Sequence, residues 1–171
     1  DRRGAFVWRL DANNAVEQGA AFVVTSVGTA RDLGIPTDRW VFPWVGTDAH
    51  EHWFTSNRWD LAEAPAIRIA GGAALELGGI GVDDLAHVDV YSCFPSAVEI
   101  GCDELGLSTD RQLTVYGGLC FAGGPWNNPV GHAIAAMVDV LRADPGARGL
   151  VTANGGNIQK HSFGVYSTEP S

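Results

Sequence analysis

Five segments of the chain have the hydrophobic pattern of β-strands. Residues 19–26 form a continuous apolar run of strand length, which is typical of a strand buried on both faces. Residues 40–45 are rich in aromatic and β-branched side chains, and residues 87–91, 149–153 and 162–167 are short apolar or alternating runs. An Asn-Gly-Gly-Asn turn separates the last two runs, so we expect them to pair as a hairpin.

Four segments between these runs have helical spacing and helix-ending residues: 27–33, 64–78, 97–105 and 129–142. The second carries a stripe of small residues, which implies that another backbone approaches it closely. Because strands alternate with helices, we expect an α/β fold in which a mixed five-stranded sheet has helices on both faces, with a parallel core and an antiparallel hairpin at its end. Residues 3–12 alternate loosely and indicate an edge strand or arm.

Composition and charge limit the class of protein. The 171 residues predict one domain covering 1–171, and 46% of them are hydrophobic. A net charge of −9, with ten arginines and a single lysine, argues against a nucleic-acid-binding protein. No apolar run has the length of a membrane span. Three irregularly spaced cysteines form neither a disulfide framework nor a zinc motif, so we expect a cytoplasmic protein without a metal site.

A glycine-rich stretch, residues 116–132, carries the first candidate chemistry. Four glycines precede its first proline, and Asn127 and Asn128 follow just before the last predicted helix. Such a loop brings the backbone close to a ligand at a helix start, where free N–H groups hold anions or oxyanions. Residues 91–94 and 154–157 also follow predicted strands. Ligands of α/β proteins gather at strand carboxyl ends, so we expect the three loops to form one site.

Four motifs together resemble the C-terminal half of a thiolase, most closely the sterol-carrier-protein-2 (SCP2) type and its thiolase-like relatives. The motifs are Asn-Asn-Ala-Val-Glu-Gln-Gly-Ala-Ala from Asn13, Val-Asp-Val-Tyr-Ser-Cys-Phe from Val88, Gly-Gly to Gly-Gly-Pro from Gly117, and Thr-Ala-Asn-Gly-Gly from Thr152. The resemblance implies an acetyl-CoA acetyltransferase-like enzyme of lipid metabolism that has a coenzyme A thioester as substrate or ligand. It also implies a first half, outside this sequence, that supplies the nucleophilic cysteine.

By this resemblance, the substrate-binding loops contain Gly123, Gly124, Asn127, Asn128, Asn154, Gly155 and Gly156. The sequence departs from the family at three places. Gly124 stands where a histidine is expected, Ala153 (or Thr152, if the gap shifts) replaces a cysteine base, and Tyr91 replaces Asn or His. These groups move protons and stabilise an oxyanion in the family's reaction, so the standard chemistry is expected to be altered or lost.

Two side chains are candidates for the remaining chemistry. One interpretation is that the Tyr91 hydroxyl, at a strand end, acts as an acid or donates a hydrogen bond to an oxyanion. The alternative is that the Tyr91 side chain only packs there. His161 replaces the missing base, since histidine titrates near neutral pH, or has a surface or capping role. The single lysine, Lys160, meets a CoA phosphate or is simply solvated.

Three functions stay open at this point. The first is a thiolase-like acyltransferase domain with degenerate loops that acts on or binds an acyl-CoA. The second is an aldolase-type C–C lyase that acts on a CoA-linked side chain through Tyr91. The third is a non-catalytic subunit that binds CoA esters beside a partner. In each case this half alone is expected to be inactive, and the stripe on residues 64–79 is expected to drive assembly into a homo- or hetero-oligomer.

Overall fold

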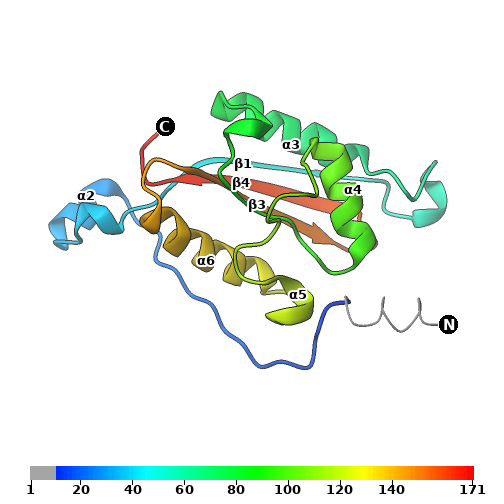
Figure 1. Cartoon of the computed structure of the whole chain (residues 1–171), viewed down its shortest axis with the longest axis horizontal. Helices are drawn as coiled ribbons and strands as arrows, with labels where there is room; N and C mark the ends of the chain where they lie inside the picture. Colours follow the sequence, from blue (N-terminus) through cyan, green and yellow to red (C-terminus); the bar gives the residue numbers. More distant parts are fainter. Residues whose placement is uncertain (1–10) are drawn as a thin grey trace.

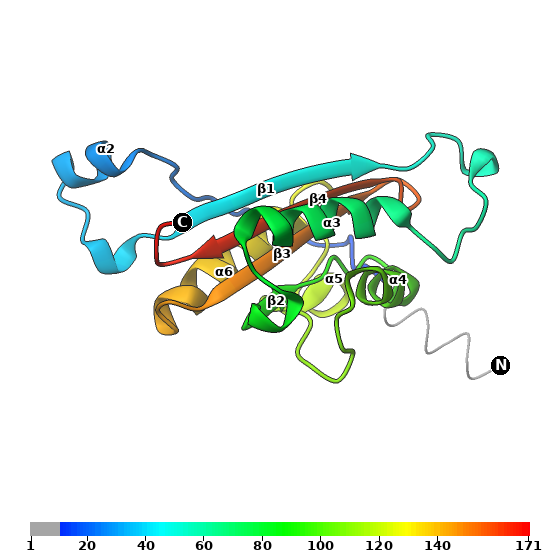
Figure 2. The same ribbon diagram turned by 90° about the horizontal axis from the view of Figure 1, so that it is seen from above.

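The computed structural model describes residues 11–171, so nearly all of the predicted arm at 3–12 lies outside the described residues. A mixed sheet of four strands forms the centre: β1 (Phe42–His50), β2 (His87–Asp89), β3 (Arg148–Gly155) and β4 (Lys160–Ser167). Their order across the sheet is β1-β4-β3-β2, and Figure 2 shows them side by side. The predicted hairpin is β3–β4, which is antiparallel, as is β1–β4, whereas β2 and β3 are parallel.

Helices cover both faces of the sheet, as the alternating pattern predicts (Figure 1). Two long helices, α3 (Pro65–Gly78) and α4 (Pro95–Leu105), lie on one face. The short α5 (Gly118–Phe121) and the long α6 (Pro129–Ala143) lie on the other. The remaining pieces are α2 (Val27–Asp32) and three 3-10 turns, η1 (Thr37–Arg39), η2 (Thr55–Asn57) and η3 (Val82–Asp84).

The helix ends follow local chemistry. Ser26 accepts a hydrogen bond from the Thr29 backbone N–H and so caps α2. Pro65 lies in the first turn of α3, and Gly79 ends that helix in the left-handed region at φ 62°. Gly106 ends α4 in the same way at φ 70°. Four helices are therefore found within about two residues of their predicted bounds.

The small-residue stripe of α3 is buried inside this chain, which contradicts its predicted role in assembly. Ala70 and Ala74 are buried in the core that α3 shares with the sheet. A Cβ at Gly71 would overlap the end of the Leu105 side chain. The close neighbours of the stripe are thus α4 and the sheet, so it offers no exposed surface for a second protein.

The prediction of five strands is wrong by one. Residues 19–26 form no strand, although their apolar pattern predicts one. In contrast, β1 extends to His50, beyond the predicted bound at Val45, because residues 45–50 pair with β4. Strand formation depends on an available partner strand, which β1 has and residues 19–26 lack within residues 11–171.

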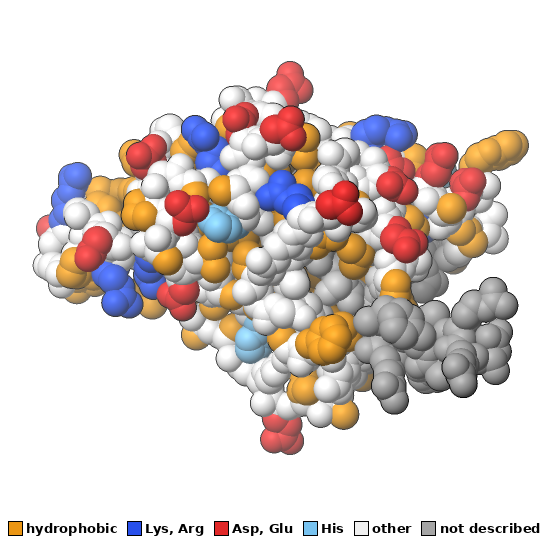
Figure 3. Space-filling model, in the orientation of Figure 1, with side chains coloured by type: hydrophobic (Ala, Val, Ile, Leu, Met, Phe, Trp, Pro, Cys, Tyr) orange, Lys and Arg blue, Asp and Glu red, His pale blue; other side chains and the backbone are white. Residues whose placement is uncertain are grey.

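Two features of the described residues bear on their surroundings. None of their helices combines the length and apolar character needed to cross a bilayer. On the face seen in Figure 3, acidic side chains are spread widely, with Lys and Arg side chains among them. Charges of both signs are therefore interspersed on this face.

Candidate functional site

The loop at residues 91–94 links the other two predicted loops. The Tyr91 backbone N–H donates to Thr152 Oγ1 at 2.9 Å, which ties the loop to β3. Ser92 Oγ accepts from the backbone N–H of Leu119 at 3.1 Å, which ties it to the start of α5. At the end of β3, the Asn154 side-chain amide donates to Cys93 Sγ at 3.8 Å. The three loops therefore meet around residues 91–94.

An extended segment, residues 12–14, lies between two of these loops. The Ala12 N–H donates to the Cys93 carbonyl at 3.0 Å, and the Asn13 N–H donates to the Leu119 carbonyl at 2.9 Å. The Asn13 carbonyl in turn accepts from the Gly124 N–H at 2.9 Å. These backbone hydrogen bonds fix the two loops relative to each other without using any side chain.

The glycine-rich loop has a conformation that requires glycine. Gly117, Gly118 and Gly123 lie in the left-handed region, with φ values of 107°, 72° and 109°. Gly124 is buried, and a Cβ there would lie 3.2 Å from Ala12 Cβ and 3.3 Å from Asn14 Oδ1. The space that a side chain at position 124 would need is therefore already filled by the 12–14 segment.

The other predicted loop residues have simpler surroundings. Asn127 is exposed, and within residues 11–171 neither its side chain nor that of Asn128 makes a hydrogen bond. Gly155 is the last residue of β3, and Gly156 begins the β3–β4 turn with a φ of 64°. These positions shape the backbone and bring no acid–base group to the site.

Tyr91 and His161 both line a small cavity between the sheet and the α3–α4 layer, together with Thr152 and Asn154. Its volume is about 10 Å³, close to that of a single water site. Burial, followed by the neighbouring Cys93, raises the pKa of Tyr91, so the phenol keeps its proton at neutral pH. Tyr91 is thus suited to donate a hydrogen bond rather than to act as a base.

His161 is a core residue, unlike the surface or capping role weighed from the sequence. Its exposed fraction is only 3%, and it shares a face of β4 with Phe163 and Val165. Burial lowers the pKa of His161 and keeps the imidazole neutral. Its Nε2 atom is buried without a hydrogen-bond partner among the described residues. A buried, neutral imidazole beside a cavity for one water can accept a hydrogen bond there.

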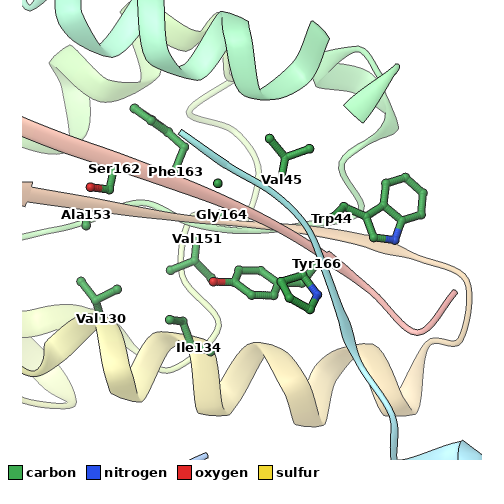
Figure 4. A pocket seen from close by; sticks show the side chains of 12 residues that line it. Trp44, Val45, Val130, Ile134, Val151, Ala153, Ser162, Phe163, Gly164 and Tyr166 are labelled. Atoms are coloured by element: carbon green, nitrogen blue, oxygen red, sulfur yellow. The ribbon is translucent and has the colours of Figure 1, made fainter. Parts of the chain in front are cut away.

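A larger apolar cavity of about 330 Å³ lies on the opposite face, between the sheet and α6 (Figure 4). Its walls include Ala153 and Ser162 from the hairpin and Val130 and Ile134 from α6. Strand alternation places Ala153 on this face and Thr152 on the other. Ala153 therefore faces the layer of the glycine-rich loop, which favours it over Thr152 as the counterpart of the family's cysteine.

Three residues that hold the site together were not among the predicted site residues. Ser92 and Thr152 join loops through their hydroxyls, and Asp89 accepts from Thr114 Oγ1 and the Val115 N–H at 2.8 and 2.9 Å. A charged residue inside the apolar run Val88-Asp89-Val90 is a sign of such a role, because a buried carboxylate needs partners. Ser92 and Thr152 have no comparable sequence mark.

The metal-binding residue types do not gather among residues 11–171: no three His, Cys, Asp or Glu side chains lie close enough to share an ion. Cys93, Cys102 and Cys120 are free thiols. Burial raises the pKa of Cys93 and of Cys102, which keeps both protonated at neutral pH.

The fold and the loops define a thiolase-like α/β protein. The chain is similar to the crystal structure of a monomeric SCP2-thiolase-like protein type 1 from Mycobacterium smegmatis, with 46% identity and a TM-score of 0.82. The match covers 86% of this chain and 33% of that protein, so this chain spans about a third of its length. The similarity supports the SCP2-thiolase-like family. No protein-family model and no curated protein matches the chain.

Proposed function

We propose that this chain is the C-terminal domain of an SCP2-thiolase-like protein, acetyl-CoA acetyltransferase-like, and that its three loops bind an acyl-CoA thioester with degenerate catalytic groups. The observation that carries the proposal is the meeting of the three motif-bearing loops around residues 91–94. The loops offer backbone N–H groups and glycines, which suit a thioester oxygen or a phosphate. They place no ionisable side chain at Gly124 or Ala153, where the family's acid–base groups are expected.

Binding without ordinary turnover is the expected result. The test protein is a chimera in which this chain replaces the matching third of the Mycobacterium smegmatis protein. Titration calorimetry should detect binding of acetyl-CoA. Thiolysis of acetoacetyl-CoA should run at least about 100-fold below the rate of an ordinary thiolase, because general acid–base groups typically contribute that much or more. Ordinary thiolase rates would overturn the claim of degenerate chemistry, and failure to bind acetyl-CoA would overturn the site.

Two glycines provide a matched pair of variants for the same titration. Gly123 and Gly146 both have left-handed backbone, at φ 109° and 86°, but Gly146 lies in the turn between α6 and β3. Alanine costs about 1–2 kcal/mol in that conformation, enough to shift either loop. Gly123→Ala should weaken acetyl-CoA binding by up to about tenfold, whereas Gly146→Ala should leave it unchanged. Equal effects would place the ligand elsewhere.

The place of Tyr91 in the loop that meets the other two loops favours a second candidate, aldolase-type cleavage of a β-hydroxyacyl-CoA. In that step the bond between the α and β carbons breaks, its electron pair forms the thioester enolate, and the β-hydroxyl gives its proton to water as the carbonyl product forms. The enolate then takes a proton from water at its α carbon, which gives the shortened acyl-CoA. Tyr91 would donate a hydrogen bond to the enolate oxygen, a role open to a phenol that stays protonated at neutral pH.

Substitution of this tyrosine in the chimera tests the second candidate. Tyr91→Phe should lower retro-aldol cleavage by roughly 100-fold, the usual effect of losing one oxyanion donor. Tyr166 is the matched control, because burial also raises the pKa of Tyr166 but its ring lines the cavity on the other face of the sheet. Tyr166→Phe should keep the parent rate. Cleavage that Tyr91→Phe leaves untouched would rule out this role.

A further inference from the structure

His161 carries a buried hydrogen-bond acceptor that no other group in residues 11–171 satisfies. Its side chain lies between β4 and the α3–α4 layer, and its Nε2 atom is fully buried without a partner among these residues. Leaving such an atom unsatisfied costs stability, so a buried polar atom of this kind usually contacts a bound water or an ion. No group of three metal-binding side chains lies in the described part of the chain, so a water is the partner that fits.

The other ring nitrogen of His161 determines which atom accepts. The imidazole makes a hydrogen bond with the Ile158 carbonyl, and since Nε2 has no partner, the N–H that donates to this carbonyl belongs to Nδ1. Burial lowers the pKa of His161, so the ring stays neutral at pH 7. A neutral ring with its proton on Nδ1 has a lone pair on Nε2, which can therefore only accept.

A cavity of the size of one water adjoins this side chain. Its volume is about 10 Å³, near the smallest that holds a water. Four of its wall residues have polar side chains: Tyr91, Thr152, Asn154 and His161. The strand register places Asn154 opposite His161, with Thr152 two residues earlier in β3, so these three side chains share one face of the sheet. The cavity thus offers the two to four polar partners that a buried water needs.

Two of these groups fix the directions of the hydrogen bonds. Thr152 Oγ1 accepts from the Tyr91 N–H at 2.9 Å, and its own proton is left to donate. His161 Nε2 can only accept. A water that accepts from Thr152 and donates to His161 has one O–H left, which the hydroxyl oxygen of Tyr91 can accept. Such a water makes three hydrogen bonds, the usual number for a buried water, and it leaves the phenol proton of Tyr91 free.

We propose that this cavity is the binding site of a single water, and that His161, acting through this water, orients the Tyr91 hydroxyl to donate its proton toward the enolate oxygen. The water lies behind Tyr91, between the sheet and the α3–α4 layer, and does not touch the ligand. His161 is then a positioning residue rather than a base for the aldolase-type step, so the inference rests on the second candidate function. It also gives a role to a polar residue on an otherwise apolar face of β4, beside Phe163 and Val165.

A crystal structure of the chimera with the Mycobacterium smegmatis protein tests the water site directly. It should show a water at about 2.9 Å from His161 Nε2, the usual length of such a hydrogen bond. A dry cavity in the parent chimera would overturn the proposal, even if the chimera binds acetyl-CoA. Acetyl-CoA titration is read separately: a chimera that holds the water without binding acetyl-CoA would contradict the proposed function and leave the water site in place.

Two substitutions of His161 in the chimera separate the acceptor from simple packing. His161→Leu removes the acceptor and should lower kcat for retro-aldol cleavage by about tenfold, the effect of one hydrogen bond, with little change in KM. His161→Gln keeps an acceptor oxygen and should recover most of that rate. Val165→Ala is the control, because Val165 shares this face of β4 but is not a wall of the cavity. It should lower stability and keep kcat. Equal losses in the Leu and Gln variants would contradict the role of the acceptor.

A double-substitution cycle shows whether His161 acts through Tyr91. A Tyr91→Phe protein has no hydroxyl to orient, so adding His161→Leu should cause no further loss of its residual cleavage. Two losses that multiply would show that His161 acts independently of Tyr91, which would overturn the positioning role.

Discussion

Replacing Asp89 with Ala is expected to lower the free energy of unfolding by about 3 kcal/mol, since two hydrogen-bond donors lose a buried acceptor. Asp89 Oδ2 accepts from Thr114 Oγ1 and from the Val115 N–H, and its side chain is almost completely buried. Thr114 Oγ1 also accepts from the Gly117 N–H at 3.1 Å, so the carboxylate orders the entry to the glycine-rich loop. Urea denaturation measures the loss, and faster exchange of the Gly117 amide should accompany it.

The matched variant, Asp89→Asn, separates the shape of this side chain from its charge. Burial raises the pKa of Asp89 more than the hydrogen bonds from Val115 and Thr114 lower it. A raised folded-state pKa means that the stability from the protonated carboxyl is full below about pH 3.9 and is lost as pH rises through the folded pKa. Asn keeps a neutral acceptor at every pH. Its stability relative to the parent should therefore improve between pH 4 and pH 7.

One result for Asp89→Asn would contradict the expected effect of burial. If this variant lost as much stability at pH 7 as Asp89→Ala, the negative charge itself would be the stabilising feature. The hydrogen bonds would then outweigh desolvation, opposite to the direction of the pKa shift.

The helices could be predicted because their ends depend on nearby residues. Pro65, Gly79 and Gly106 act within one turn of the helix they begin or end, so the chain alone contains that information. Strand bounds depend on partners that lie far along the chain. β2 is two residues shorter than predicted because the Val90 N–H bonds to the Leu113 carbonyl and the Tyr91 N–H to Thr152 Oγ1, which takes both out of the ladder.

The site also has features that the sequence predicts and features that it does not. The glycine-rich loop could be found from composition, because left-handed backbone at Gly117, Gly118 and Gly123 requires that residue type. The hydroxyl of Thr152, by contrast, finds its partner 61 residues away, and no local pattern encodes that choice. The burial of His161 could have been predicted, since alternate residues His161, Phe163 and Val165 share a face of the last strand.

Introducing the family's histidine at position 124 is expected to destabilise this protein by about 1–3 kcal/mol, the usual range for overpacking. A Cβ at Gly124 would lie 3.2 Å from Ala12 and 3.3 Å from Leu119, and an imidazole needs more room than a single carbon. The segment at 12–14 would have to move, which breaks its backbone hydrogen bonds to Cys93 and Leu119. Thermal denaturation of Gly124→His measures the loss, and faster exchange of the Ala12 and Asn13 amides identifies its cause.

Position 153 is the control, because it lines the 330 Å³ cavity and has space beside it. Ala153→Cys should change stability by less than about 1 kcal/mol, since one added sulfur enters an existing void. The loss of stability of Gly124→Ala should fall between those of Gly124→His and Ala153→Cys, because the neighbours of an alanine Cβ need to move by only a few tenths of an ångström. A Gly124→His protein as stable as the parent would show that the loop still accommodates the histidine. A loss of stability would show, in contrast, that the backbone and side chains around position 124 leave no room for an imidazole.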